Sequence, residues 1–290
     1  MSAMQTVFRT IIRHGLRPLL RPEVPLGVRR RATGALGVVR RLPRGTQVSR
    51  TELGARPAER IDPAHASGAG VVLYLHGGGY TIAGPPTHRA LAAHLAEAAG
   101  RPVYVLDYRL APEHPFPAAL DDAVAAYHDL LAAGHTEITV AGDSAGGGLA
   151  VALAVTLRAG TAPGPDALLL ISPWTDLGLS DPWLTGRVDD MLPLGWLRQC
   201  ALAYAADPAD PLVSPVYADL AGLPPVTVHV GAEEILRADA ERLAESLRAA
   251  GVPVELTVFD GMWHVWHLHA GLFRAATDAV AALGAAVPRG

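Results

Sequence analysis

The chain alternates short apolar runs with longer, Ala-rich segments in which polar and apolar residues mix. Val71–Leu75 consists of apolar residues only, and such a run predicts a strand that is buried on both faces of a sheet. Further candidate strands follow at 103–107, 138–141, 167–171, 226–230 and 254–259. The remaining segments predict helices at 87–99, 117–133, 194–204, 236–250 and about 268–283. Strands that alternate with helices predict an α/β fold, in which a mainly parallel sheet is covered by helices on both faces.

Two shorter segments, 46–53 and 56–62, precede the first buried run and alternate polar with apolar residues. Gly54-Ala55 separates them, so they predict two strands joined by a tight turn. Together with the six later strands, they predict an eight-stranded sheet.

Two other segments depart from the strand and helix alternation. Residues 1 to about 45 have a basic, helical pattern interrupted by prolines, and they predict an appendage to the sheet. Residues 177 to about 210 contain a loop and a helix where the next strand would be expected, which is typical of an inserted cap. The length of 290 residues suits one elaborated domain, so we expect a single domain over 1–290 with a helical cap built from these two segments.

Composition narrows the class of partner. The net charge of −4 argues against nucleic acid as a partner. All 24 positively charged residues are Arg, and 11 of them lie in the first 50 residues. Because these arginines interrupt every apolar stretch near the N-terminus, we expect no secretion signal and no membrane span. The amphipathic pattern of this segment fits contact with an anionic membrane or a cover over an apolar pocket, and we favour the pocket.

A single cysteine, Cys200, rules out an intramolecular disulfide. Such cysteine usage is typical of a reducing cytoplasm, which is the location we expect. Composition does not decide the oligomeric state, so a monomer and a homodimer both remain open.

The first candidate for chemistry is Ser144 in the segment Gly142-Asp143-Ser144-Ala145-Gly146, which has the pattern G-x-S-x-G. A candidate strand precedes it and an Ala-rich segment follows it. A strand, a sharp turn and a helix in this order form a nucleophile elbow, which exposes the serine hydroxyl at the end of the sheet. A glycine-rich turn in any α/β protein can have the same pattern, so the interpretation depends on a base, an acid and an oxyanion hole nearby.

Candidates for these three groups follow other strand ends. Glu233 comes after strand 226–230, and His264 comes after strand 254–259. Ligands bind beyond the carboxyl ends of parallel strands, and the order Ser, acid, His is that of an α/β-hydrolase triad. Imidazole would take the proton of the serine hydroxyl, and the carboxylate would hold the imidazole in the required tautomer. A glycine-rich loop after Val71–Leu75 would direct backbone amides at the substrate oxyanion.

Three segments make the chain similar to bacterial hormone-sensitive-lipase-type esterases of the α/β-hydrolase superfamily. They are His76-Gly77-Gly78-Gly79, residues 107–119 (DYRLAPEHPFPAA) and residues 142–147 (GDSAGG). The similarity extends from about residue 45 to the C-terminus. It implies a serine carboxylesterase that hydrolyses short-to-medium-chain acyl esters, small-molecule substrates, through an acyl-enzyme intermediate. The resemblance places the oxyanion donors at Gly77, Gly78 and Ala145.

The acid departs from the pattern of this family, in which Asp is most common. Here Glu233 occupies that place, with Glu234 adjacent and Asp239 further along. Glutamate also serves as the acid on this fold. The family pattern puts the acid at 233, so we rank Glu233 first, Asp239 second and Glu234 third.

Other polar residues near these motifs have simpler interpretations. Four acidic residues are expected to be scaffolding that holds the loops: Glu113, Asp121, Asp122 and Asp143. We expect no cofactor and no metal, because the histidines 264, 267 and 269 are accompanied by no cysteine or paired carboxylate. His229, inside a strand, is expected to be a core histidine with a hydrogen-bond partner.

Two other functions remain open. The same triad could hydrolyse a lactone or an amide, because the pocket and not the triad selects the substrate. The fold is also used by non-catalytic small-molecule binding proteins such as the plant gibberellin receptors, which have lost the catalytic histidine. The presence of both Ser144 and His264 argues against such a binding protein.

Overall fold

The computed structural model describes residues 3–36, 41–66, 70–184 and 189–288. Within these ranges the strands are β1 (Gln47–Leu53), β2 (Arg56–Asp62), β3 (Val71–Leu75), β4 (Val103–Leu106), β5 (Ile138–Asp143), β6 (Ala167–Ile171), β7 (Val226–Gly231) and β8 (Val254–Phe259). They form one sheet with the order β1-β2-β4-β3-β5-β6-β7-β8. β1 and β2 are antiparallel, as are β2 and β4, and the other neighbours are parallel. The predicted eight-stranded, mainly parallel sheet is confirmed.

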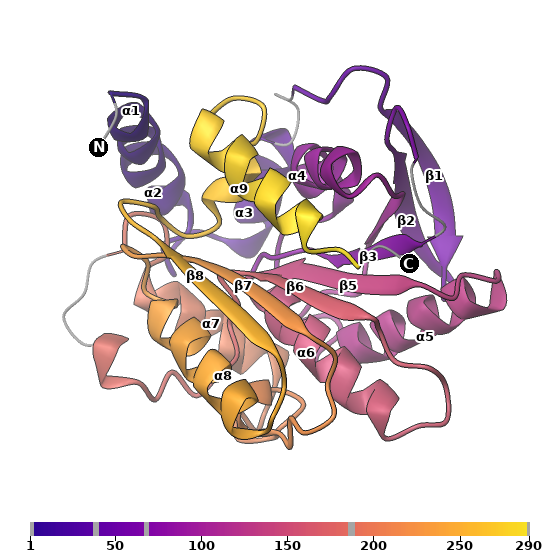
Figure 1. Ribbon diagram of the computed structural model, residues 1–290. Coiled ribbons are helices and arrows are strands. Elements are labelled where there is room, and N and C mark those ends of the chain that lie inside the picture. The colour runs from indigo at the N-terminus through magenta and orange to yellow at the C-terminus, as the bar shows by residue number, and fades with distance from the viewer. Residues whose placement is uncertain (1–2, 37–40, 67–69, 185–188, 289–290) are drawn as a thin grey trace.

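Helices cover both faces of this sheet (Figure 1). The longest are α4 (Pro85–Ala99), α5 (Ala118–Ala132), α6 (Ala145–Arg158), α8 (Arg237–Ala249) and α9 (Arg274–Ala285). α4 and α9 lie on one face, and α5, α6 and α8 lie on the other. Because both faces are covered, β3, β5 and β6 are buried along their whole lengths. Burial on both faces explains why these strands are largely continuous apolar runs.

The register of β3 and β5 brings two sequence motifs together. Leu75 of β3 lies opposite Gly142 of β5, and the two strands are parallel. The loop that begins at His76 and the turn that contains Ser144 therefore leave the sheet side by side. β7 and β8 run in the same direction as β5, so their following loops leave at the same edge.

The last helix begins later than the sequence predicts. Trp266–His269 form a 3₁₀ turn (η4), and α9 begins at Arg274. Gly271 lies between them with φ +81°, a left-handed conformation that a right-handed α-helix does not contain. The predicted start near residue 268 is therefore wrong.

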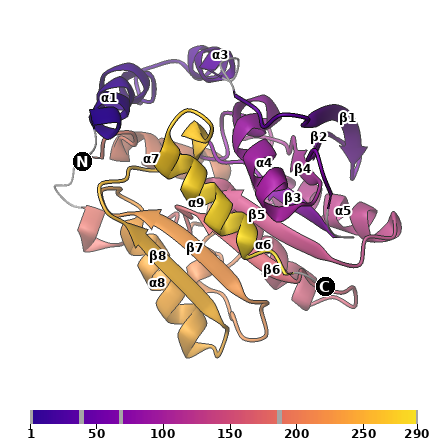
Figure 2. The ribbon, with the colours of Figure 1, turned by 45° about the horizontal axis from the view of Figure 1, so that its top comes forward.

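The N-terminal segment contains the predicted helices within residues 3–36, whereas residues 41–45, also predicted to belong to the helical pattern, form no helix. α1 (Ala3–Ile11) continues through a π-helical turn, η1 (Ile12–Leu16), into α2 (Arg17–Leu19), and α3 (Leu26–Leu36) follows. Figure 2 shows α1 and α3 as an outer layer on the side of α4 and α9. The inserted segment contributes α7 (Leu194–Tyr204) and a short 3₁₀ turn, η2 (Pro182–Leu184), before it; a second 3₁₀ turn, η3 (Pro215–Tyr217), follows the segment. In the described ranges, no helix combines the length and apolar character that crossing a bilayer requires.

Candidate active site

Ser144 occupies the turn between β5 and α6, with φ +52° and ψ −121°. A residue with a side chain is strained at positive φ, and the turn is tight enough to require small neighbours. A Cβ atom on Gly142 would lie 2.3 Å from the carbonyl oxygen of Gly146, and one on Gly146 would lie 2.0 Å from the carbonyl oxygen of Leu75. The G-x-S-x-G segment therefore forms the sharp strand, turn and helix of a nucleophile elbow.

His264, in the loop after β8, meets a buried carboxylate. Its Nδ1 lies 3.2 Å from Oε2 of Glu234, and the two side chains are 2% and 0% exposed. A carboxylate partner favours the tautomer with hydrogen on Nδ1, which leaves Nε2 able to accept a proton. His264 and Ser144 line the same cavity. The structure records no hydrogen bond between them in its described part, and such bonds are often long before substrate binds.

Glu233 faces away from this pair. Its side chain is 46% exposed and lies 3.3 Å from the guanidinium of Arg9 in α1. Glu234 instead is 1% exposed, and Ile235 and Leu236 after it are also buried. The prediction that Glu233 is the carboxylate beside His264 is therefore wrong, and Glu234, ranked third, occupies that place. In the sequence, the two apolar residues that follow Glu234 are the signal that favours it.

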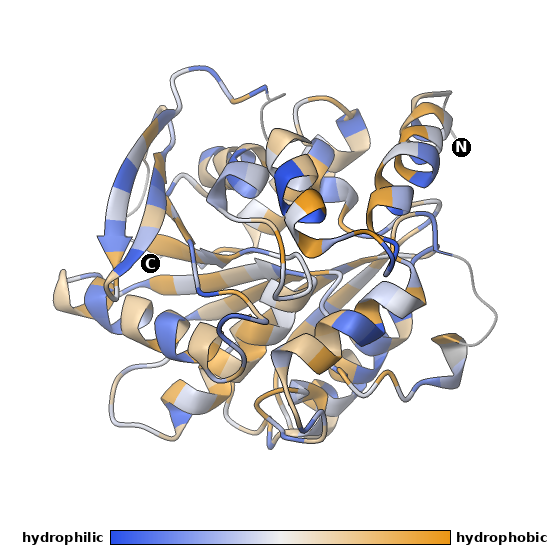
Figure 3. Cartoon of the chain, turned by 180° about the vertical axis from the view of Figure 1, so that it is seen from behind, coloured by the Kyte–Doolittle hydropathy of each residue, from blue (hydrophilic) through white to orange (hydrophobic). Residues whose placement is uncertain are grey.

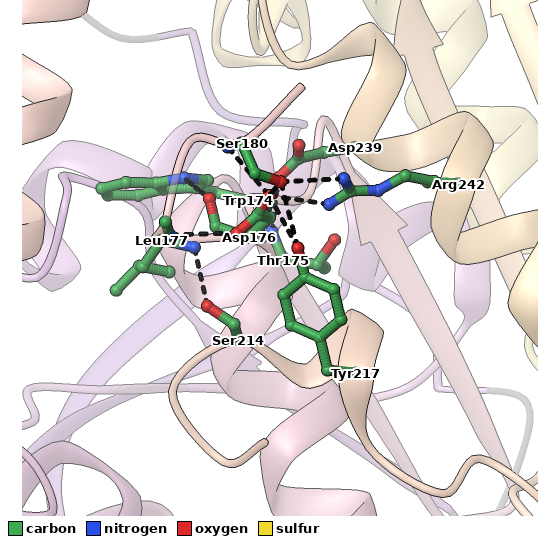
Figure 4. A network of polar contacts seen from close by, with 10 residues as sticks. Trp174, Thr175, Asp176, Leu177, Ser180, Ser214, Tyr217, Asp239 and Arg242 are labelled. Carbon is green, nitrogen blue, oxygen red and sulfur yellow. Dashed lines mark hydrogen bonds and ion pairs between the residues drawn. The ribbon is translucent and has the colours of Figure 1, made fainter. Parts of the chain in front are cut away.

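Asp239, the second-ranked acid, belongs to a separate network (Figure 4). It accepts hydrogen bonds from the backbone amides of Thr175 and Asp176, both at 2.9 Å. Asp176 in turn pairs with Arg242 of α8 at 2.9 Å and accepts from the Ser180 hydroxyl at 2.6 Å. Burial raises the pKa of Asp239 to about 7. This network joins the start of the inserted segment to α8 and does not include His264.

A further carboxylate beside the Glu234–His264 pair was missed in the sequence. Asp189 is 2% exposed and accepts the backbone amide of Ile235 at 2.7 Å. Its other oxygen accepts the amides of Met191 and Leu192 at 2.6 and 2.7 Å. Asp189 thus joins the inserted segment to the residue after Glu234, and only this long-range contact reveals it.

The charges around His264 change its pKa. Burial alone would lower the pKa of this histidine, but the hydrogen bond and the charge of Glu234 outweigh burial. The charges of Asp189 and Asp143 act in the same direction as Glu234. The pKa of His264 is therefore raised above its ordinary value of 6.5, because negative charge stabilises the imidazolium.

The glycine-rich loop after β3 presents its amides unequally. The N–H of Gly77 donates to Oδ1 of Asp143 at 3.0 Å, so the prediction that it is an oxyanion donor is wrong. Gly78 has φ +120° and lines the cavity. Within the described structure, the amides of Gly78, Gly79 and Ala145 have no acceptor. Ala145 begins α6, and the first amides of a helix have no partner within it.

Asp143 fixes the position of this loop, as predicted. Besides the amide of Gly77, it accepts the hydroxyl of Tyr74 at 2.8 Å and lies 3.2 Å from Nε2 of His88. Burial by itself would raise the pKa of Asp143. The charge and hydrogen bond of His88, together with the hydrogen bonds from Tyr74 and Gly77, outweigh burial and hold this pKa below its usual range. The carboxylate remains ionised and bound, which is the state that holds the loop.

Two of the other predicted scaffold residues also hold loops. Glu113 pairs with Arg30 of α3 at 2.7 Å, and Asp122 pairs with Arg109 at 2.7 Å. Both contacts join the 107–119 segment to a helix. Asp121 makes no side-chain hydrogen bond in the described part of the chain, so its predicted role as scaffolding gains no support.

The cavity beside Ser144 has a volume of about 540 Å³. Much of its wall is apolar and is formed by segments other than the loops that follow the strands. The N-terminal helices contribute Ile11, Ile12, Gly15, Leu16, Leu19 and Leu20, and the inserted segment contributes Met191, Leu192 and Trp196. Both segments that the sequence predicts as a cap therefore border the cavity.

The histidines near His264 have other partners. Nδ1 of His229 lies 3.2 Å from Nε2 of His267, so His229 is the partnered core histidine that the sequence predicts. Burial lowers the pKa of His269 to about 4. In the part of the chain that the structure describes, no three His, Cys, Asp or Glu side chains form a group that could hold a metal ion.

Known proteins resemble this chain over nearly its full length. Residues 72–268 match a family defined by the α/β hydrolase fold. An acetyl-hydrolase of Streptomyces hygroscopicus is 43% identical over 260 residues, which are 88% of this chain and 84% of the relative. A solved esterase from the bacterial hormone-sensitive lipase family is 40% identical with a TM-score of 0.92, covering 98% of this chain and 97% of its own. EstE5, solved after soaking with p-nitrophenyl butyrate, is 35% identical with the same TM-score and coverage.

The matches span the elbow, the glycine-rich loop and the His264 loop, and the relatives share one class of reaction. The chain therefore belongs to the bacterial hormone-sensitive lipase family of α/β-hydrolase-fold esterases and is a carboxylic ester hydrolase.

Proposed function

We propose that the enzyme hydrolyses short-to-medium-chain acyl esters through an acyl-enzyme on Ser144. Oγ of Ser144 attacks the ester carbonyl while Nε2 of His264 takes its proton. The same proton then passes to the departing alcohol as the bond between the carbonyl carbon and the alcohol oxygen breaks. Water repeats the sequence on the acyl-enzyme and releases the acid. The observation that carries this proposal is the buried His264–Glu234 pair beside the cavity that Ser144 lines.

Glu234 is the acid in this proposal. Its carboxylate would hold His264 with Nε2 toward Ser144 and stabilise the imidazolium that forms during attack. Gly78 and Ala145 are the proposed oxyanion donors, with the amide of Gly79 next to them. Their support is that these amides lack protein acceptors, and unoccupied donors suit an oxygen that becomes negative in the transition state.

The proposed cap consists of 1–45 and about 177–210. Residues 1–2, 37–40 and 185–188 of these segments lie outside the described residues. The cap proposal is supported by the apolar side chains that both segments place in the cavity wall. A cavity of about 540 Å³ is within the usual range of small-molecule sites, and butyrate is the acyl group in the compound soaked into EstE5 crystals. These observations favour short-to-medium acyl chains.

The test combines a substrate series with removal of the nucleophile. We expect kcat/KM on p-nitrophenyl esters to be highest for short-to-medium chains and low for palmitate. Ser144→Ala should lower turnover by a factor on the order of 10⁶, and a serine-reactive phosphonate should label Ser144 alone. A maximum at palmitate, or faster hydrolysis of lactones or amides, would overturn the substrate class. An active Ser144→Ala protein would overturn the mechanism.

A further inference from the structure

Helix α1 exposes apolar side chains although its inner face is packed. Met4, Val7 and Ile11 are 50%, 52% and 59% exposed. Their spacing of three and four residues places them along one side of the helix, and we call them the α1 patch. On the inner side, Ile12 is 2% exposed, and the ring of Phe8 stacks on the ring of Trp263 with 6.5 Å between the ring centroids. Packing against the protein therefore leaves the α1 patch uncovered.

The α1 patch lies in the most basic part of the chain. Residues 1–50 contain 11 Arg and one acidic residue, whereas the whole chain has a net charge of −4. Figure 3 shows hydrophobic and hydrophilic residues interleaved along the helix at the N-terminus. Among the described residues before β1, the exposed arginines are Arg13, Arg21, Arg31, Arg41 and Arg44. None of these five forms an ion pair with another described residue.

The α1 patch is continuous with the cavity that contains Ser144. Ile11 belongs to both, because it is exposed and also lines the cavity. Leu272, 40% exposed, and Arg41 also line the cavity. The α1 patch therefore shares an exposed residue with the cavity wall, and one exposed arginine of this region, Arg41, lines the same cavity.

We propose that the α1 patch and its surrounding arginines dock the enzyme on an anionic lipid surface. Amphipathic helices with apolar residues on one side and arginines around them bind such surfaces by inserting the apolar side chains and attracting the lipid charge. A second copy of the chain would present the same positive region, and repulsion disfavours that pairing. Nucleic acid would match the charge but would not bury Met4 and Val7. The docking itself does not depend on the proposed triad, whereas delivery of lipid esters to the cavity does.

Vesicle sedimentation tests the docking with the full chain. We expect binding to phosphatidylglycerol vesicles at low ionic strength at least about tenfold tighter than to phosphatidylcholine vesicles, and loss of that preference in high salt. Met4→Glu with Val7→Glu should weaken binding to anionic vesicles at least about tenfold, because carboxylates replace the inserting side chains. Arg13→Gln with Arg21→Gln should weaken it similarly. Since Met4, Val7, Arg13 and Arg21 do not line the cavity, hydrolysis of water-soluble esters should be unchanged in both variants.

Leu202→Glu is the matched control, because Leu202 is 82% exposed but lies on α7. It should bind anionic vesicles like the unmodified protein, and so should Ser144→Ala. The proposal is overturned if the unmodified protein binds neither vesicle or binds both equally, or if Leu202→Glu weakens binding as much as the α1 variants. It is also overturned if vesicle binding is absent and ultracentrifugation shows a dimer that becomes a monomer in the Met4→Glu, Val7→Glu variant. An inactive triad would leave the vesicle results unchanged, so the two proposals fail separately.

Discussion

The loop after β7 places two consecutive glutamates in opposite environments. Glu233 reaches solvent and Arg9, while Glu234 is buried against His264. Both carry the same functional group, so their chemistry differs only through position. A charge that is buried beside imidazole changes its proton affinity, whereas an exposed one is screened by water.

The same substitution at these two positions gives a matched pair of variants. Glu234→Gln should lower kcat by up to about 10⁴, as in a serine protease whose triad Asp becomes Asn. Glu233→Gln should keep kcat within about twofold, because an exposed ion pair contributes little. Glu234→Asp should retain part of the activity, since the carboxylate remains but is withdrawn by one methylene. Steady-state kinetics on folded proteins would contradict the assignment if Glu233→Gln lost more activity than Glu234→Gln.

The pH dependence follows from the raised pKa of His264. Only neutral imidazole accepts the serine proton, so kcat/KM should fall as the pH drops through a midpoint above 6.5. In Glu234→Gln the residual activity should show a lower midpoint, because the charge that raises the pKa has been removed. The dependence of kcat/KM on pH, recorded at constant ionic strength for the unmodified enzyme and for Glu234→Gln, measures the two midpoints. A rate that stays flat down to about pH 4 would contradict a histidine base.

Among the elements, the inserted segment is fixed to the core by buried carboxylates. Asp239 holds the amides of Thr175 and Asp176, and Asp189 holds the amide of Ile235. A buried amide that loses its acceptor costs roughly 1–3 kcal/mol. These contacts therefore position the segment that lines the cavity without acting on substrate.

Asp239→Ala should test this separation of roles. It leaves two buried amides without an acceptor, so the free energy of unfolding should fall by roughly 2–6 kcal/mol. Where the protein remains folded, kcat should fall far less than in Glu234→Gln. Chemical denaturation and kinetics on the same preparation measure the two effects. A loss of kcat equal to that of Glu234→Gln, with stability unchanged, would assign Asp239 to the triad.

At the scale of the whole molecule, α1 contacts both loops that carry the His264–Glu234 pair. Arg9 lies 2.6 Å from Asp190 of the inserted segment and 3.3 Å from Glu233. The ring of Phe8 stacks on Trp263, which directly precedes His264. The N-terminal segment is therefore joined to the active site from outside the sheet.

Deleting about the first 40 residues should uncover the cavity. The remaining protein would keep Ser144 and His264, but buried apolar residues such as Trp263 would become exposed, which promotes aggregation. We expect altered acyl preference in the p-nitrophenyl series and lower solubility. Unchanged preference with full solubility would show that this segment does not cover the pocket.

The sequence by itself determined where the strands lie along the chain and where the nucleophile elbow is. Buried parallel strands require continuous apolar runs, and their carboxyl ends share one edge, so local patterns were sufficient to place Ser144, His264 and the glycine-rich loop together. Only the tertiary structure decided that Glu234 and not Glu233 meets His264, and that Asp143 occupies the amide of Gly77. Which way a loop side chain points depends on packing from distant segments, such as the contact of Asp189 with Ile235, and no local pattern records that contact.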